Sequence, residues 1–450
     1  MKLTLVGGGG SRTPVLYHGL VQRQEVLRVD ELVLHDTDAA ALGRIGRVLD
    51  GIDERGGPRV THRATTDLDD ALDGADFVLT AIRAGGFDAR VLDETIPLEH
   101  GVIGQETVGP GGFALALRNV PALAAVAARM SARCPDAWLV NLSNPAGMAT
   151  QALVPLLDGR VVGVCDSPLA LGRGVAAVLG VDVSALHLEY AGLNHLGWLR
   201  GVWLGGRDVL PGLLESPEAK AIEEVRLFGA DEVRAAGRIP NEYVYFYEHA
   251  AEAIANVREA GGPRGAFLLA EQRALAARLD AAASPAEALA VYEDSLRTRN
   301  DTYMSVEAGL QRDPSDDVFA SAGGYHEMAL SVVEAIACDS PAVLIVNTTN
   351  RGAVAGLADD DVVEVPAVVR GAGVFPLATR LDEPDRRLVE QVKAYERATL
   401  AAIEHRSVAD ARAALAAHPL VADRAVADAI VDGYLARIPG LADWFEEGPR

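Results

Sequence analysis

The chain has 450 residues, of which 49% are hydrophobic and 23% are charged, so it is long enough for two globular domains. Its 64 acidic residues outnumber its 41 Lys and Arg, and a formal net charge of −23 argues against nucleic-acid and anionic-membrane partners. The three cysteines are too few for a disulfide framework, and no apolar run reaches the roughly 20 residues of a membrane helix. We therefore expect a cytoplasmic protein with reduced thiols.

The chain begins with a buried strand and a glycine-rich turn. Residues 3–6 are apolar, four glycines follow, and residues 13–20 are typical of a helix. We expect no secretory signal before this strand. Strand, turn and helix N-terminus together form an anion site, because free backbone N–H groups and the helix dipole converge there. The turn lacks the full G-x-G-x-x-G spacing, so on its own it is equally compatible with a purely structural turn.

Up to about residue 180, short apolar runs alternate with Ala- and Leu-rich helical segments. The predicted strands are 3–6, 31–35, 59–62, 77–81, 138–141 and 161–164, and helices are predicted over 39–49, 120–133 and 145–157. This alternation predicts a Rossmann-like, doubly wound parallel sheet domain over residues 1–180. The second strand ends in Asp36, which suits the ribose hydroxyls of NAD and would repel the extra phosphate of NADP.

After about residue 180 the pattern changes. Residues 214–300 are largely helical by pattern, strands are predicted over 342–347 and 362–369, and Ala-rich amphipathic helices run from 382 to about 437. We predict an α+β, mostly helical substrate domain over 181–450. Closing over the first domain, it would place a substrate cleft between the two.

Polar side chains follow several of the predicted strands. Arg83 and Arg90 come after strand 77–81, where they could clamp an anionic or polyhydroxy substrate or be ordinary surface cations. The segment 104–112, with Glu106, is too rich in glycine for a helix. Asn141 and Asn144 follow strand 138–141, and they could serve a ligand or cap the next helix.

A thiol, a carboxylate and an imidazole form a second group. Cys165 and Asp166 directly follow strand 161–164, and His195 stands between apolar residues. Singly, such residues are more often buried packing groups. Together they could form an N/O/S metal site with open positions for substrate, or Cys165 and His195 could be a nucleophile pair. Sequence spacing does not decide between these interpretations.

Two later segments add candidates. Tyr243, Tyr245 and Tyr247 alternate along the chain, which is typical of an aromatic packing face. Arg264 follows a Gly-Pro pair at the start of a predicted helix, where it could contact a phosphate.

Taken together, these segments resemble glycoside hydrolase family 4, the NAD- and manganese-dependent glycosidases, and most of all its 6-phospho-β-glucosidases. The resemblance covers nearly the whole chain. It is carried by the glycine turn with Thr13-Pro14, Ile82-Arg83, Gly104-Gln105-Glu106-Thr107, Asn144-Pro145, Cys165, Asn194-His195, Val346-Asn347 and Val365-Pro366.

The resemblance implies hydrolysis of 6-phospho-β-glucosides by a redox route. NAD would take hydride from C3 of the sugar, the C2 proton would be removed, and the aglycone would be eliminated. Water would then add at C1, and the hydride would return. The alternatives are a 6-phospho-α-glucosidase, a glycosidase of an unphosphorylated sugar, and a 2-hydroxyacid-type NAD dehydrogenase.

The resemblance also assigns roles residue by residue. It implies catalysis by Tyr243 (base) and Asp166, a divalent metal such as Mn²⁺ on Cys165 and His195, cofactor contacts from Gly7, Gly8, Gly9, Gly10, Ser11, Asp36, Ile82 and Asn141, and substrate contacts from Arg83, Arg90, Glu106, Asn144, Asn194 and Arg264. A homodimer or homotetramer is expected as well.

Three positions depart from the family pattern. Arg12 stands where the family usually has an aromatic residue before Thr-Pro. Asp166 follows the metal cysteine, where β-specific members usually carry Asn and α-specific members carry Asp. The segment after Arg264 lacks the glutamate that usually follows Gly265. These departures leave the anomeric preference and the need for a 6-phosphate open.

Overall fold

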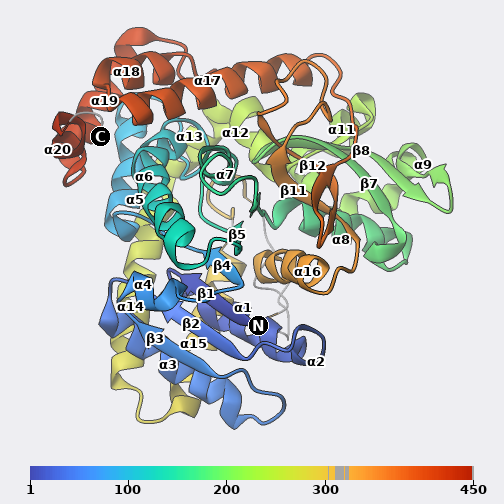
Figure 1. Cartoon of the computed structure of the whole chain (residues 1–450). Coiled ribbons are helices and arrows are strands. Elements are labelled where there is room, and N and C mark those ends of the chain that lie inside the picture. The colour runs from blue at the N-terminus through green and yellow to red at the C-terminus, as the bar shows by residue number, and fades with distance from the viewer. Residues whose placement is uncertain (303, 310–318, 320–323, 448–450) are drawn as a thin grey trace.

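A computed structural model describes residues 1–302, 304–309, 319 and 324–447 (Figure 1). The first six strands are parallel and lie in the order β3-β2-β1-β4-β5-β6. This is the strand order of a Rossmann sheet, as the sequence predicted. The strands are β1 (Lys2–Val6), β2 (Glu31–His35), β3 (His62–Thr65), β4 (Phe77–Thr80), β5 (Trp138–Asn141) and β6 (Val161–Gly163).

Helices follow these strands and cover the sheet. They are α1 (Thr13–Gln22), α2 (Gln24–Leu27), α3 (Ala39–Glu54), α4 (Leu68–Leu72), α5 (Gly86–Glu99), α6 (Gly109–Arg133), α7 (Ala146–Leu153) and α8 (Ser167–Leu179). Their local signals are ordinary: Asp38 caps α3 by accepting from the N–H groups of Ala40 and Ala41, and Gly180 ends α8 with a φ of 67°.

The second half of the chain extends the same sheet. Strand β11 pairs antiparallel with β6 and β12, and β12 pairs with β7. The strands are β7 (His187–Leu193), β8 (Leu196–Leu204), β9 (Arg207–Asp208), β10 (Ile239–Pro240), β11 (Ala342–Thr349), β12 (Val362–Arg370) and β13 (Gly373–Pro376). The sheet is therefore continuous from the parallel strands into the antiparallel ones.

Most of the remaining chain is helical. The α-helices are α9 (Leu210–Glu215), α10 (Glu223–Phe228), α11 (Ala230–Ala236), α12 (Tyr245–Glu248), α13 (Ala250–Glu259), α14 (Arg264–Ala281), α15 (Pro285–Asp301), α16 (Tyr325–Ala337), α17 (Asp385–His405), α18 (Val408–Ala416), α19 (Arg424–Arg437) and α20 (Leu441–Glu446), and the 3₁₀ turns are η1 (Val183–Ala185), η2 (Pro217–Ala221) and η3 (Glu242–Val244). In Figure 1, α17 to α20 lie at the opposite end of the molecule from β2 and β3.

Two late helices return to the first half of the chain. Helix α15 packs on α3, and α16 packs on α1. The first contact is close, because a Cβ on Gly51 of α3 would lie 2.4 Å from the carbonyl oxygen of Pro285. This packing brings the end of α15 and the start of α16 next to the glycine-rich turn.

Two predicted elements are corrected by the structure. The third strand is His62–Thr65, three residues later than predicted, because β3 is an edge strand without a buried face and Val60 instead accepts a hydrogen bond from Tyr17. The segment 104–112 is not entirely loop, since α6 begins at Gly109. A Cβ on Gly111 would lie 2.0 Å from the carbonyl oxygen of Gln105, so this glycine serves close packing rather than flexibility.

Helix α6 also corrects the expectation about membrane helices. By length and composition, it is the one helix among the described residues that could cross a membrane. However, 67% of its most apolar window is buried inside the protein, as in a core helix.

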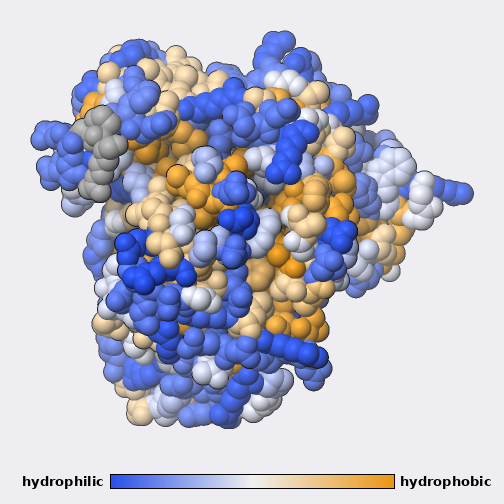
Figure 2. Space-filling view, in the orientation of Figure 1, coloured by the Kyte–Doolittle hydropathy of each residue, from blue (hydrophilic) through white to orange (hydrophobic). Residues whose placement is uncertain are grey.

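The face of the molecule in Figure 2 is largely hydrophilic, with apolar residues gathered toward its middle and right.

Candidate active site

A cleft lies at the carboxyl edge of the parallel strands, where ligands bind in open α/β sheets. It has a volume of about 1120 Å³. Its lining comes from segments after four parallel strands and from four later segments. The sequence-predicted residues that line it are Arg90, Glu106, Asn144, Asp166, Tyr243 and Arg264.

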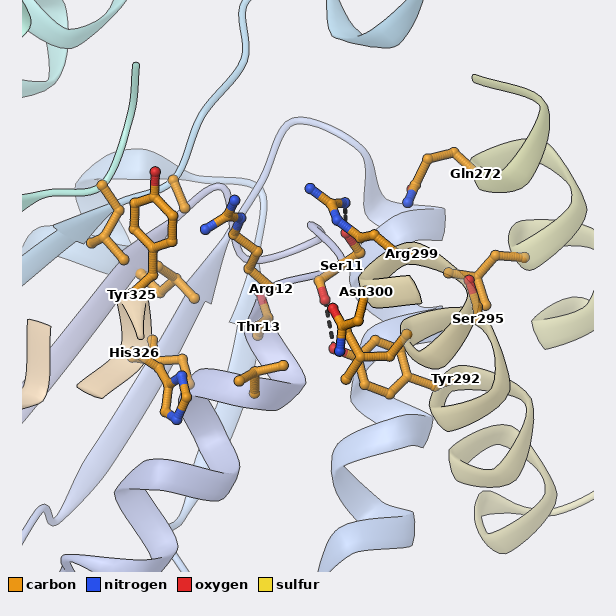
Figure 3. Close-up of a pocket in the computed structure, with 17 residues that line it drawn as sticks. Ser11, Arg12, Thr13, Gln272, Tyr292, Ser295, Arg299, Asn300, Tyr325 and His326 are labelled. Atoms are coloured by element: carbon orange, nitrogen blue, oxygen red, sulfur yellow. Dashed lines mark hydrogen bonds between the residues drawn. The ribbon is translucent and has the colours of Figure 1, made fainter. Parts of the chain in front are cut away.

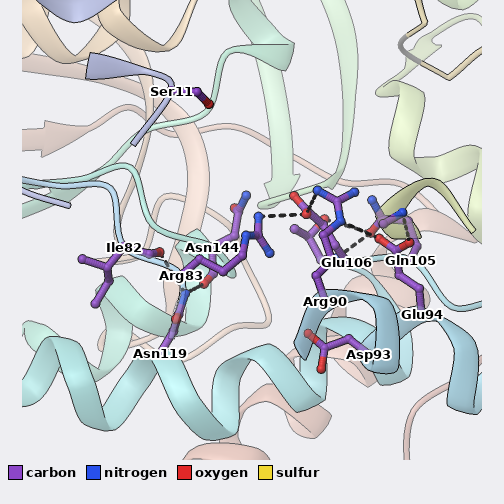
Figure 4. Close-up of polar contacts among 12 residues, drawn as sticks. Ser11, Ile82, Arg83, Arg90, Asp93, Glu94, Gln105, Glu106, Asn119 and Asn144 are labelled. Carbon is purple, nitrogen blue, oxygen red and sulfur yellow. Dashed lines mark hydrogen bonds and ion pairs between the residues drawn. The ribbon is translucent and has the colours of Figure 1, made fainter. Parts of the chain in front are cut away.

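Glu106 holds two arginines at this cleft (Figure 4). Its Oε2 lies 2.8 Å from Arg83 Nη2 and is ion-paired with Arg90. Burial alone would raise the pKa of this carboxyl, but the surrounding guanidinium groups lower it to about 2. Arg90 Nε also donates to Glu94 Oε1 at 2.8 Å. These side chains form a rigid, charged wall that can hold sugar hydroxyls.

A second layer of contacts fixes this wall. Arg118 on α6 donates to both oxygens of the buried Asp93 on α5, at 2.9 and 2.6 Å. Asn119 accepts from Ala84 N at 2.7 Å and donates to the carbonyl of Asn144 at 2.6 Å. The loops that carry Arg83 and Asn144 are therefore tied to α6.

His195 lies in the two-residue turn between β7 and β8, with a φ of 63°. Its imidazole is buried and stacks on the Tyr243 ring, with 3.7 Å between centroids. Nδ1 lies 2.7 Å from Thr107 Oγ1, and Nε2 is a buried nitrogen without a hydrogen-bond partner among the described residues. Burial lowers the pKa of His195 to about 3, so the imidazole is neutral and can act as a metal ligand.

Cys165 is the second predicted metal ligand. It is buried, and burial, with the nearby Glu364 and Asp166, raises the pKa of its thiol well above the usual value. A bound divalent cation would remove that proton, since coordinated thiols are deprotonated. Among the described residues, the only group of three or more potential ligands within reach of one another is Glu232, Glu248 and His249. A metal on the Cys165–His195 pair therefore needs oxygen ligands from substrate or water, as an open catalytic site does.

A further acidic side chain, that of Glu242, contacts Ser167, which lies two residues after Cys165. Ser167 Oγ donates to the buried Glu242 Oε1 at 2.6 Å, and burial raises the pKa of Glu242 to about 7. Asn241 caps the turn η3 by accepting from Tyr243 N at 3.0 Å, which fixes the backbone of Tyr243 at the cleft.

The backbone N–H groups of Gly7 to Gly10 all donate within the protein, in contrast to the free N–H groups expected at this turn. Gly7 and Gly8 donate their N–H groups to His35 O, and Gly9 donates to Asp36 Oδ2 at 3.0 Å. Gly7, with a φ of 95°, leaves no room for a side chain, because a Cβ would lie 2.5 Å from Ala81 O. A cavity of about 720 Å³ adjoins the turn and is lined by Ser11, Arg12 and Thr13 (Figure 3).

Four predicted site residues are engaged elsewhere. Asn141 is fully buried and bonds to Thr80 and Ser143. Ile82 N donates to Ser143 Oγ, and Asn194 Nδ2 donates to the buried Glu364. Arg264 lines the cleft, but its guanidinium donates to the carbonyls of Thr302 and Arg299 at the end of α15.

The structure adds residues that the sequence did not indicate. Arg299 and Tyr325 line both cavities, and Gln105 Oε1 accepts hydrogen bonds from Thr107 N, Thr107 Oγ1 and Val108 N. Gln105 and Thr107 belong to the Gly104-Gln105-Glu106-Thr107 motif, although the sequence assigned a role only to Glu106. Arg299, in contrast, ends an ordinary amphipathic helix and carries no local signal.

Comparisons with known proteins agree with this architecture. A profile of the family 4 glycosyl hydrolases matches residues 2–181, and one of the family 4 glycosyl hydrolase C-terminal domain matches residues 190–421. The chain is 34% identical over 445 residues to a probable 6-phospho-beta-glucosidase of Bacillus subtilis, covering 97% of this chain and 96% of that protein.

Two solved structures are similar throughout. The 6-phospho-beta-glucosidase of Thermotoga maritima with manganese, NAD+ and glucose-6-phosphate has a TM-score of 0.82 and 26% identity, over 97% of this chain and 98% of that one. A 6-phospho-alpha-glucosidase from gut microorganisms in complex with NAD and Mn2+ has a TM-score of 0.81 and 26% identity, over 98% of each chain. With both profiles matched along most of its length, this chain belongs to the family 4 glycosyl hydrolases.

Proposed function

We propose that this chain hydrolyses 6-phospho-β-glucosides, with NAD and a divalent metal such as Mn²⁺ as resident cofactors. The observation that carries the proposal is the stack of His195 on Tyr243 beside an arginine-lined cleft, with His195 Nε2 buried and unpartnered in the part of the chain that the structure describes. The names of the Bacillus subtilis and Thermotoga maritima relatives support the β-glucoside, the 6-phosphate and both cofactors.

The proposed reaction divides the work among this chain's residues. When bound, NAD supplies a reversible hydride acceptor for C3 of the sugar, and the divalent ion supplies a Lewis acid for the C2 and C3 oxygens. Cys165 and His195 hold the ion, and Asp36 contacts the nucleotide ribose. Arg83, Arg90, Glu106 and Asn144 hold sugar hydroxyls.

Tyr243 is the proposed base. Oxidation at C3 makes the C2 proton acidic, and the Tyr243 oxygen removes it. The aglycone leaves C1, and Asp166 gives the leaving oxygen a proton. Water then adds at C1, the C2 proton returns, and the hydride goes back to C3. No NADH accumulates, which separates this route from a dehydrogenase, and membership of a glycosidase family supports it.

A second candidate is a 6-phospho-α-glucosidase. It is favoured by Asp166, which lines the cleft at the start of α8 and which resembles the acid of α-specific members. The similarity to the 6-phospho-alpha-glucosidase structure fits this candidate equally well.

The test is a panel of α and β p-nitrophenyl glucosides, each with and without a 6-phosphate, assayed with NAD and Mn²⁺. We expect release of nitrophenol from the β 6-phosphate, its loss when a chelator removes the metal, and no net NADH. Preference for the α 6-phosphate would support the second candidate. Equal rates with unphosphorylated glucosides, or NADH produced in step with product, would contradict both.

The same assay in D₂O tests the base. The product should carry deuterium at C2, and Tyr243→Phe should slow this exchange by about 10² to 10⁴, the usual contribution of a general base. Tyr245→Phe is the matched control, because Tyr245 packs against Phe228 and does not line the cleft. Undiminished exchange in Tyr243→Phe would exclude Tyr243 as the base.

A further inference from the structure

The cavity beside the glycine turn has an unusual charge pattern. Of the 17 described residues that line it, two are arginines, Arg12 and Arg299, and none is Asp or Glu (Figure 3). Its other walls are largely apolar or uncharged. Two arginines that face one cavity without an Asp or Glu among its described lining residues indicate a place for an anion.

Neither arginine is neutralised within the described part of the chain. Arg12 forms no ion pair there, and its guanidinium lies over the Tyr325 ring, 3.9 Å from the centroid. Among the described residues Arg299 forms no ion pair either, and its guanidinium donates to Ser11 Oγ at 3.4 Å. The pKa of Arg299 is lowered to about 9 by burial and by the guanidinium groups of Arg12, Arg90 and Arg264. A bound anion would relieve this repulsion.

Two carboxylates of the neighbouring cleft, Glu106 and Glu94, are already paired with other groups. Glu106 pairs with Arg83 and Arg90, and Glu94 accepts from Arg90 and from Gly265 N. Arg264 is the residue that the sequence favoured for a phosphate contact. Its guanidinium donates hydrogen bonds to backbone carbonyls at the end of α15. That contact holds the turn that follows Arg299, so Arg264 positions its neighbour.

Arg12 and Arg299 also stand where two spaces meet. Both line the cavity at the glycine turn and the larger substrate cleft, together with Asn300 and Tyr325. Figure 3 shows the Arg299 guanidinium against Ser11 and Arg12 beside them, near the start of α1. The N-terminus of α1 adds the positive end of a helix dipole to the same place.

We propose that Arg12 and Arg299 together bind one phosphate group at the junction of the two cavities. The stacking on Tyr325 holds the planar guanidinium of Arg12 in a fixed orientation, which suits two parallel hydrogen bonds to phosphate oxygens. The phosphate belongs either to the dinucleotide or to the 6-phospho sugar. This inference rests on the proposed function for the identity of these ligands, and binding without turnover tests it.

The experiment measures dissociation constants of NAD, glucose 6-phosphate and glucose by calorimetry for the full chain, Arg12→Gln and Arg299→Gln. Loss of a charged hydrogen-bond donor should weaken one phosphate-bearing ligand by about tenfold or more, and glucose should be unaffected. Arg12→Lys should recover part of the affinity, because it keeps the charge and loses the planar fork. Arg273→Gln is the control, since Arg273 is 68% exposed and pairs with Asp88 on the surface.

Each outcome has a defined meaning. Weakened glucose 6-phosphate binding with unchanged NAD binding assigns the site to the substrate, and the reverse assigns it to the cofactor. If both arginine variants fold, as judged by circular dichroism, and bind all three ligands like the parent, the proposal is wrong. Should Arg299→Gln not fold, the exposed Arg12 decides the matter alone. If the protein hydrolyses only unphosphorylated glucosides, the proposed function is wrong. The NAD measurement still tests the phosphate site in that case.

Discussion

A hydrogen bond from His195 to Thr107 determines how His195 can serve as a ligand. The Thr107 hydroxyl donates to Gln105 Oε1 at 2.9 Å, so it accepts from His195 Nδ1–H at 2.7 Å. With its proton on Nδ1, the imidazole presents a lone pair at Nε2. Partners of this kind fix the tautomer and the ring orientation of metal-binding histidines.

Replacing Thr107 should therefore weaken metal binding. Thr107→Val keeps the shape of the side chain and removes the hydroxyl, so we expect Mn²⁺ affinity to fall by about 10- to 100-fold. Titration calorimetry with Mn²⁺ measures this directly, without turnover. Thr107→Ser is the matched control and should bind the metal like the parent. Equal affinities in the Val and Ser variants would show that the hydroxyl does not orient His195.

At this scale, the sequence indicates residue types better than contacts. The place of Arg83 and Arg90 after a strand left a substrate clamp and surface cations equally open, and only the family resemblance implied substrate contacts. Their shared partner Glu106 could not be inferred. The bond between Thr107 and His195 joins residues from separate loops, and Arg299 reaches the site only because α15 packs on α3. The catalytic, metal and substrate roles stay predictions until tested.

The helices α5 and α6 and the loop between them form one close-packed element. Gly104 lies against α5, and a Cβ there would be 1.8 Å from Glu94 O. Gly111 lies against the loop itself, near Gln105 O. This fit places Glu106 and Thr107, and it explains why glycines that look like loop signals begin a buried helix.

Gly104→Ala should disturb this element. The added methyl has no space, so the loop must move, and we expect a loss of about 1–3 kcal/mol in the free energy of unfolding. Urea unfolding measures it, and weaker Mn²⁺ binding should accompany it because Thr107 shifts. Gly43→Ala on α3 is the control: nothing lies within 4 Å of its Cβ, so alanine should stabilise by up to about 1 kcal/mol. Similar effects of the two substitutions would contradict this account.

For the whole molecule, sequence periodicity predicted the parallel strands and the antiparallel strands β11 and β12 well, but it missed the hairpin β7–β8. Strands β2 and β5 lie at their predicted positions, since buried parallel strands are short apolar runs bounded by turns. The hairpin β7–β8 was not predicted as strands, although its turn was singled out for His195. Its pairing through β12 and β11 to β6 depends on contacts distant in sequence. The division at residue 180 and the homo-oligomer stay predictions.

Buried neutral histidines should make the stability of the molecule depend on pH. His418, 1% exposed, accepts from Leu420 N through Nδ1, and burial lowers its pKa to about 3. The unfolded chain takes up this proton below about pH 6.5, whereas the folded chain does not. The contribution of His418 is therefore complete above pH 6.5 and decreases by about 1.4 kcal/mol per pH unit below it.

His418→Asn should remove that dependence, because the Asn oxygen can still accept from Leu420 N and does not titrate. Losing the ring beside Tyr395 lowers stability at every pH, so the informative quantity is the change between pH 7.5 and pH 5.0 in urea unfolding. The parent should lose about 2 kcal/mol more than the variant over this interval. His100→Asn, on the surface, serves as control. If the parent and His418→Asn lose the same amount, His418 does not stay neutral in the folded protein, and another group must account for any acid sensitivity.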